Sequence, residues 1–92
     1  MNVTLTQQVK PSADVLVQEV GGEAVLLDLT SERYFGLDPV GTRIWSLLSQ
    51  EARLQQVFEV LCAEYEVEPS RLQTDLLALV GQLAEAGLVE VH

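Results

Sequence analysis

The chain has 92 residues, which is enough for one small domain with one core and too few for a second. Its hydrophobic content of 48% excludes global disorder. Its 14 acidic and 5 basic residues give a formal net charge of −9, which argues against a DNA or RNA partner, because phosphate binding relies on clustered Lys and Arg. The charge permits a neutral or basic peptide as a partner.

The cysteine content, the N-terminal residues and the length of the apolar runs indicate where in the cell we expect the protein. Cys62 is the one cysteine, whereas small secreted domains usually carry an even set, so we expect a cytoplasmic protein. The first twelve residues lack the apolar stretch of a signal peptide. The sequence also lacks an apolar run of membrane-spanning length, so we expect no membrane partner.

The first half of the chain predicts strands. Residues 1–13 are polar and contain a proline, and we expect them to form a flexible arm that precedes a domain over 14–92. Residues 15–20 and 23–29 are two apolar segments separated by Gly-Gly, which tolerates the positive φ of a tight hairpin turn. After a polar turn, residues 34–37 ("YFGL") form a short third strand, with Phe35 and Leu37 on one face and Tyr34 and Gly36 on the other.

The second half predicts three helices. Asp38 can cap the first, and Pro39 suits its first position. The second helix spans about 53–65, where apolar residues recur at helical spacing. For the third, Ser70 with Gln73 fits a capping box. This helix runs to about residue 86, and Gly87 is the expected left-handed stop before a short extended tail.

The order of elements predicts the fold class. A three-stranded antiparallel meander followed by three helices is an α+β arrangement. The last two helices are joined by a short turn that contains proline, and they fit a helix-turn-helix. With the strands attached, the outline is that of a winged helix-turn-helix domain.

Few side chains are candidates for catalysis or for metal binding. His92 is the last residue, and a frayed terminus cannot hold a general base in place. Cys62 has no basic neighbour in sequence and is expected to pack as a small hydrophobe. Three carboxylates lie at alternate positions, at Glu64, Glu66 and Glu68. They do not fit a calcium-binding loop, because such a loop requires a glycine that is absent here. We therefore predict a protein that is not an enzyme, with no catalytic residue, no metal site and no cofactor.

The strand over 34–37 is the most informative feature. Edge strands are usually protected from pairing with another strand by charge, by proline or by a covering element. These four residues carry none of these protections. Gly36 would let another backbone approach closely. The strand is either covered by its own helices or receives an extended peptide by strand addition. Trp45 likewise either seals helix against sheet or offers its surface to a partner.

The stretch "VLLDLTSERYFGLDPVGTRIW" followed by "EVLCAEYEVEPSRLQTDLLALVGQLAEAGLVEV" resembles the PqqD-like family of recognition elements in ribosomal-peptide modification pathways. The resemblance covers about residues 13–91, and free-standing members with a Tyr-aromatic-Gly-Leu strand are most similar to those of lasso-peptide pathways. It implies a domain that captures the leader segment of a precursor as an added strand, between the third strand and the last helix. It also implies presentation of that leader to a maturation enzyme: a leader peptidase, a cyclase or, in pyrroloquinoline quinone synthesis, a radical enzyme.

On this resemblance we predict two sets of peptide-binding residues. The strand would contribute Arg33, Tyr34, Phe35, Gly36 and Leu37. On the last helix one apolar stripe is expected in the core, and the adjoining stripe is expected to form the groove wall. The core stripe is Leu72, Leu76, Leu79 and Leu83, and the wall is Gln73, Leu77, Val80 and Ala84.

Four alternatives remain open at this point. A winged-helix nucleic-acid binder would use a recognition helix beginning "SRLQTDLLALV", which is apolar and carries little positive charge. A small enzyme lacks a placed catalytic set. A homodimer could pair the open edges of two copies. The strand-addition site could also lie on the 15–20 edge.

Overall fold

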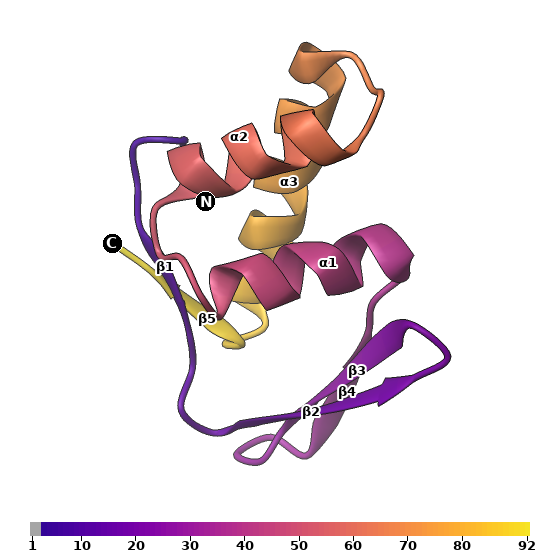
Figure 1. Ribbon diagram of the computed structural model, residues 1–92. Helices are drawn as coiled ribbons and strands as arrows, with labels where there is room; N and C mark the ends of the chain where they lie inside the picture. Colours follow the sequence, from indigo (N-terminus) through magenta and orange to yellow (C-terminus); the bar gives the residue numbers. More distant parts are fainter. Residues whose placement is uncertain (1–2) are drawn as a thin grey trace.

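The computed structural model describes residues 3–92, which form two small sheets and three helices (Figure 1). The elements in chain order are β1 (Val9–Pro11), β2 (Val15–Val20), β3 (Glu23–Asp28), β4 (Arg33–Gly36), α1 (Pro39–Leu48), α2 (Leu54–Glu64), α3 (Pro69–Glu85) and β5 (Val89–Val91). β2, β3 and β4 form an antiparallel sheet in that order. The predicted meander followed by three helices, an α+β fold, is confirmed.

The hairpin between β2 and β3 follows from its glycines. Gly21 and Gly22 have φ of 60° and 82°, a region that glycine enters without steric cost. The turn pairs Val20 with Glu23 and fixes the register of the whole β2–β3 ladder.

The three-stranded sheet is attached to the helices through α1. The backbone N–H of Ala24 in β3 donates to the Thr42 hydroxyl of α1 at 2.7 Å. Asp38 caps α1 by accepting the Gly41 N–H at 2.6 Å, and Pro39 occupies the first turn, as predicted. The strand β4 therefore leads directly into a helix whose start is fixed.

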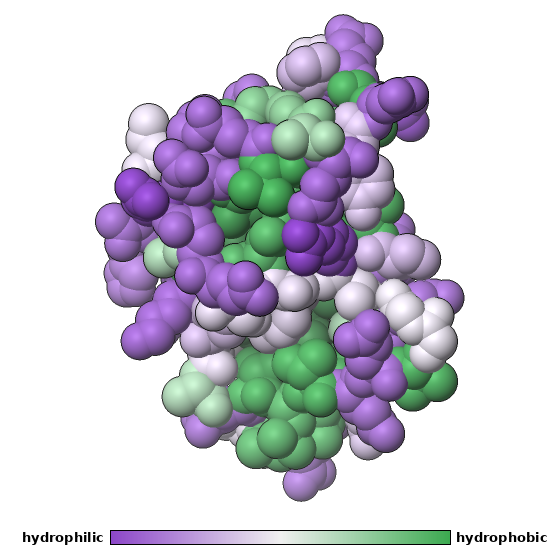
Figure 2. All heavy atoms as spheres, in the orientation of Figure 1, coloured by the Kyte–Doolittle hydropathy of each residue, from purple (hydrophilic) through white to green (hydrophobic). Residues whose placement is uncertain are grey.

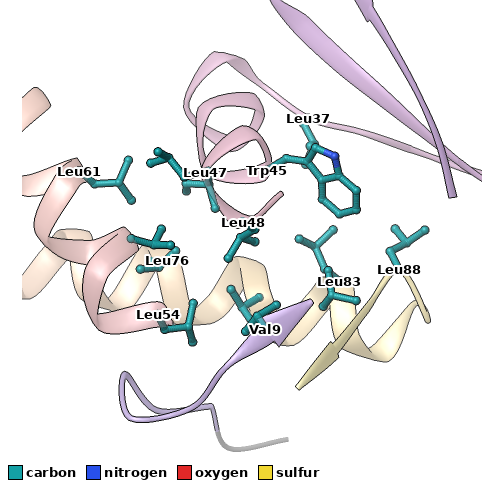
Figure 3. Packing of buried hydrophobic residues seen from close by; sticks show 14 of the residues in the cluster. Val9, Leu37, Trp45, Leu47, Leu48, Leu54, Leu61, Leu76, Leu83 and Leu88 are labelled. Carbon is teal, nitrogen blue, oxygen red and sulfur yellow. The ribbon is translucent and has the colours of Figure 1, made fainter. Parts of the chain in front are cut away.

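The core lies where the helices meet both sheets. Figure 3 shows Trp45 of α1 among leucines of α3 and of the segment before β5, and Trp45 is only 5% exposed. Of the two interpretations of Trp45, the structural one is correct. The buried residues are Val9, Ala24, Leu26, Leu37, Ile44, Trp45, Leu47, Leu48, Leu54, Val57, Leu61, Leu72, Leu76, Val80, Leu83, Leu88 and Val89.

The predicted flexible arm is wrong for Val9–Pro11. This segment is β1, which pairs antiparallel with β5 from the other end of the chain, so that Val9 faces Val91. Val9 is 0% exposed, and its N–H donates to the carbonyl of Ala52 at 2.7 Å. A three-residue strand carries no periodicity of its own, so only its distant partner reveals it. Residues 1 and 2 of the predicted arm lie outside the described residues.

The start of α3 also differs from the expectation. The helix begins at Pro69, with Glu68 at the capping position and no side-chain cap. The Ser70 hydroxyl donates to the Glu68 carboxylate at 2.9 Å instead of capping the helix. Proline favours the first helical position, because it has no N–H to satisfy, and the helix therefore starts two residues earlier than a Ser70 cap would place it. At the other end Gly87 has φ of 77°, which confirms the predicted left-handed stop.

Candidate functional site

The β4 strand has one unpaired edge. It bonds to β3 alone, with Leu26 opposite Phe35 and Val25 opposite Gly36. Leu37 donates its N–H to the carbonyl of Ala24, its opposite residue in the same register, at 2.8 Å. Because hydrogen-bonded and non-bonded pairs alternate in an antiparallel ladder, Phe35 also bonds inward. The N–H and C=O groups of Tyr34 and Gly36 therefore point outward along the free edge.

At Gly36 no side chain covers the free edge of β4. A Cβ built there would meet nothing within 4 Å, and Gly36 does not have a positive φ. The residue is therefore not required by the backbone conformation of β4. Because glycine has no side chain, the edge is unobstructed on this side.

A cavity of about 520 Å³ lies between β4, the start of α1 and one side of α3. Its apolar walls include Phe35, Val40 and Leu79, and Asp75 and Gln82 contribute polar groups. The full lining is Phe35, Gly36, Leu37, Asp38, Val40, Gly41, Ile44, Asp75, Leu79 and Gln82. The cavity borders the half of the free edge that contains Gly36.

A second cavity of about 460 Å³ borders the other half of β4. Arg33, Tyr34 and Phe35 meet the end of α3 there, at Glu85 and Ala86. Asp28 and Ser31 of the preceding turn and Leu88 complete its lining. Phe35 lines both cavities, so the two lie next to each other along β4. We refer to these two cavities together as the β4–α3 groove.

Residues 23–89 match the family of coenzyme PQQ synthesis protein D (PqqD). This match spans β3, β4, all three helices and the first residue of β5. The chain belongs to the PqqD family. The resemblance predicted from the sequence is thereby confirmed.

Two solved structures are similar to this PqqD-family chain along most of its length. One is described as TbiB1 in complex with the TbiA(beta) leader peptide; it is 41% identical, has a TM-score of 0.83, and the match covers 88% of this chain and 94% of that one. The other is lasso peptide synthetase B1 complexed with the leader peptide; it is 29% identical, has a TM-score of 0.81, and the match covers 90% and 98%. No curated protein matches the sequence.

The structure places the five predicted strand residues of this family member along the groove. Arg33 and Tyr34 line the second cavity, Gly36 and Leu37 line the first, and Phe35 lines both. Tyr34 is 73% exposed and Leu37 only 4%, so Leu37 contributes mainly the floor. Their role in peptide binding stays a prediction.

The helix residues predicted as the groove wall are rotated away from it. Val80 is 0% exposed and belongs to the core, whereas Leu79, predicted as core, lines the first cavity. Gln73, Leu77 and Ala84 line neither cavity. From Leu76 the next core position can be three or four residues on, and "LLALV" is apolar at both, so the sequence pattern does not decide the rotation.

The wall that α3 presents is Asp75, Leu79 and Gln82. The sequence analysis missed Asp75 and Gln82 as groove residues. Their spacing of four and three residues from Leu79 is the helical signal that could have found them.

The electrostatics of the groove are set by local hydrogen bonds. At the second cavity, Asp28 accepts the Ser31 hydroxyl at 2.8 Å and the Thr30 N–H at 3.0 Å, and these bonds lower the pKa of Asp28. At the first cavity, Asp38 is engaged in capping α1. Arg33 is the one base among the lining residues.

The remaining candidate residues lie elsewhere. Cys62 is a half-buried free thiol on α2, and His92 exchanges backbone hydrogen bonds with Gln8. Within residues 3–92 there is no group of three His, Cys, Asp or Glu side chains that could hold a metal ion. Among the same residues, no helix is both long and apolar enough to cross a membrane.

Proposed function

We propose that this chain binds the leader segment of a ribosomally made precursor peptide, as a strand added to the free edge of β4. The observation that carries the proposal is the unpaired edge of Tyr34 and Gly36 beside an open groove on α3. In this mode, backbone hydrogen bonds provide affinity and the neighbouring cavities provide specificity. The two similar solved structures, both leader-peptide complexes by description, support the same role here.

The geometry divides the tasks between backbone and side chains. Leader residues opposite Tyr34 and Gly36 would exchange hydrogen bonds with those outward groups. A leader residue opposite Phe35 would direct its side chain to the groove face, because opposite residues of a ladder share a face. The cavities on either side of Phe35 would then accept apolar leader side chains. The helix residues that meet them are Asp75, Leu79 and Gln82, in place of the wall predicted from sequence.

The chain would act without catalysing a reaction, as a cytoplasmic carrier that presents the bound precursor to maturation enzymes. One of the two similar structures is described as a lasso peptide synthetase B1, which favours lasso-peptide synthesis over pyrroloquinoline quinone synthesis. The partners would be a leader peptidase and a cyclase.

The test is calorimetric titration of the chain with the leader of the precursor encoded beside its gene. We expect one-to-one binding with a Kd near 1 μM, which corresponds to about −8 kcal/mol. A peptide of the same composition in scrambled order should not bind. Absence of heat and of competition with the leader, or cleavage of the precursor by the chain alone, would overturn the proposal.

A further inference from the structure

The three-stranded sheet has a second unpaired edge, along β2, which bonds to β3 alone. Leu29 donates its N–H to the carbonyl of Asp14, its opposite residue in the same register, at 2.9 Å. Because bonded pairs alternate along an antiparallel ladder, every second residue of β2 from there bonds inward. The N–H and C=O groups of Val15, Val17 and Glu19 therefore point away from β3, and we call them the β2 edge. Within residues 3–92 they have no backbone partner.

The β2 edge lacks the features that usually keep two strands from pairing. Edge strands are protected by lysine, proline, a bulge or a covering element. β2 reads VLVQEV, with no lysine and no proline, and it pairs with β3 without a bulge. Figure 2 shows apolar side chains over the lower part of the molecule, where Figure 1 places this sheet. The proposed leader strand accounts for the β4 edge, whereas the β2 edge has no assigned partner.

A further cavity borders the β2 edge. It has a volume of about 280 Å³ and lies between β2 and α1, on the side of the sheet that faces the helices. Val17, Ala24 and Trp45 form its apolar part, and Ser46 and Gln50 of α1 contribute polar groups. A strand added to β2 would direct alternate side chains to this cavity, because opposite residues of a ladder share a face. The edge thus combines open backbone groups with space for small side chains.

The β2 edge is complementary to itself. In an antiparallel pair with its two-fold axis at Val17, this residue lies opposite Val17 of a second copy, and Val15 lies opposite Glu19 of that copy. All three outward residues are then paired, and each pair exchanges both of its N–H···O=C bonds. A shift of two residues in either direction leaves one of the three without an outward partner.

The same register agrees with the charges and with the cavity. Each Glu19 meets a valine, so no carboxylate lies opposite another across the axis. The valines of the second copy lie beside Val17 and Glu19, both of which line the cavity. An unrelated strand has no such fixed register, so a second copy is the occupant that the sequence of β2 specifies.

We propose that the β2 edge is the contact between two copies of this chain, which pair around Val17 into one continuous sheet with β4 at both ends. The β4–α3 groove of each copy stays free, so the inference does not depend on the proposed function. One pair of six-residue strands is a smaller contact than the ~800 Å² that each partner of a stable interface buries, so the dimer is transient. Each copy carries a net charge of −9, and salt strengthens the association by screening that repulsion.

The experiment compares proline substitutions at the two free edges of the sheet. Val17→Pro removes an outward N–H of the β2 edge, and Gly36→Pro removes one of the β4 edge. Proline is tolerated on edge strands where the N–H has no partner in the sheet. Each protein is examined by sedimentation equilibrium at low and at high salt, and is then titrated with leader.

We expect the average mass of the wild-type chain to rise with concentration toward twice the mass of one chain, and to rise further at high salt. In Val17→Pro the dissociation constant of the dimer should increase at least about tenfold, because the substitution removes one ladder bond from each copy. Its leader Kd should equal that of the wild-type chain. Gly36→Pro should dimerise as the wild-type chain does.

A cysteine on the two-fold axis provides a second measurement should Val17→Pro melt early. Bonded residues directly opposite each other have Cα atoms about 5.5 Å apart, which a disulfide can span. Cys62→Ser first removes the native thiol. In that background Val17→Cys should form a covalent dimer on mild oxidation with diamide. Glu19→Cys should form little, because Glu19 lies opposite Val15 of the second copy.

A wild-type chain that stays monomeric at millimolar concentration in high salt overturns the inference. A dimer that Val17→Pro leaves intact, or equal cross-linking at residues 17 and 19, overturns it as well. Leader that dissociates the dimer assigns the β2 edge to leader and has the same consequence. The expected dimer in a chain that fails to bind leader supports the inference and removes the proposed function alone.

Discussion

Leu37 donates its backbone N–H to the carbonyl of Ala24 at 2.8 Å, and this bond sets the phase of the β4 ladder. With that phase, Phe35 bonds toward β3, while Tyr34 and Gly36 present their backbone groups to the free edge. Neighbouring residues of one strand thus have different tasks. Substitutions that remove one N–H at a time can separate folding from peptide binding.

Gly36→Pro should weaken leader binding and spare the fold. Proline removes an outward N–H and is tolerated on an edge strand where that group has no partner in the sheet. Loss of one ladder hydrogen bond costs about 1 kcal/mol, so the leader Kd should rise at least about fivefold. Calorimetry, with a thermal melt of the same sample, measures both effects.

Phe35→Pro is the matched control, because it removes an N–H that bonds toward Leu26. It should lower the melting temperature clearly more than Gly36→Pro does. Normal leader binding by a folded Gly36→Pro variant would move the strand-addition site away from β4, and the β2 edge would be the next candidate.

Leu79→Gln should weaken leader binding about tenfold, because it places a polar group on the wall of the first cavity where an apolar side chain would bury. Leu77→Gln is the same change two residues earlier on α3. Leu77 is also half-buried but lines neither cavity, so its leader Kd should stay within about twofold of the wild-type value. The opposite ranking would restore the groove wall predicted from sequence.

The features predicted correctly depend on short-range chemistry. Gly21 and Gly22 close a hairpin, Asp38 with Pro39 starts a helix, and Gly87 ends one, each because of backbone constraints within a few residues. Such signals are readable from the sequence without knowledge of the rest of the fold.

Two of the features predicted wrongly depend on distant contacts. Val9 becomes part of a strand only because β5 pairs with it, and neither three-residue segment has a pattern of its own. The choice between Leu79 and Val80 as a core residue is made by what packs against α3, since both fit the helical spacing. The order of elements was therefore predictable, and the rotation of the groove wall was not.

Val9→Ala should destabilise the domain by about 2 kcal/mol, because it removes two methyl groups from a fully buried position. For a chain of this size such a loss lowers the melting temperature by roughly 10 °C. Val67→Ala removes the same atoms from a site that is 42% exposed, and it should change the melting temperature little. Equal effects of the two substitutions would mean that β1 does not contribute to the stability of the folded domain.

Acid should weaken the link between α1 and α2. Arg43 donates two hydrogen bonds to the Glu64 carboxylate, at 2.8 and 2.6 Å, and these bonds lower the pKa of Glu64 below its ordinary value of 4.5. A carboxyl whose pKa is lower in the folded state contributes stability above its unfolded pKa, and the contribution is lost as pH falls through the folded value. Urea unfolding should therefore show a smaller free energy of unfolding below pH 4.5 than at pH 7.

Glu64→Gln isolates this contribution, because the amide cannot titrate. Asp28 and Glu51, whose pKa values are also lowered by their hydrogen bonds, remain in the variant and keep part of the acid sensitivity. The difference in unfolding free energy between the two pH values should shrink in Glu64→Gln and stay unchanged in Glu59→Gln, a neighbouring glutamate on α2 with no ion pair to a described residue. If both variants keep the full pH dependence, the Arg43–Glu64 pair is not stabilising in solution, as many exposed pairs are not.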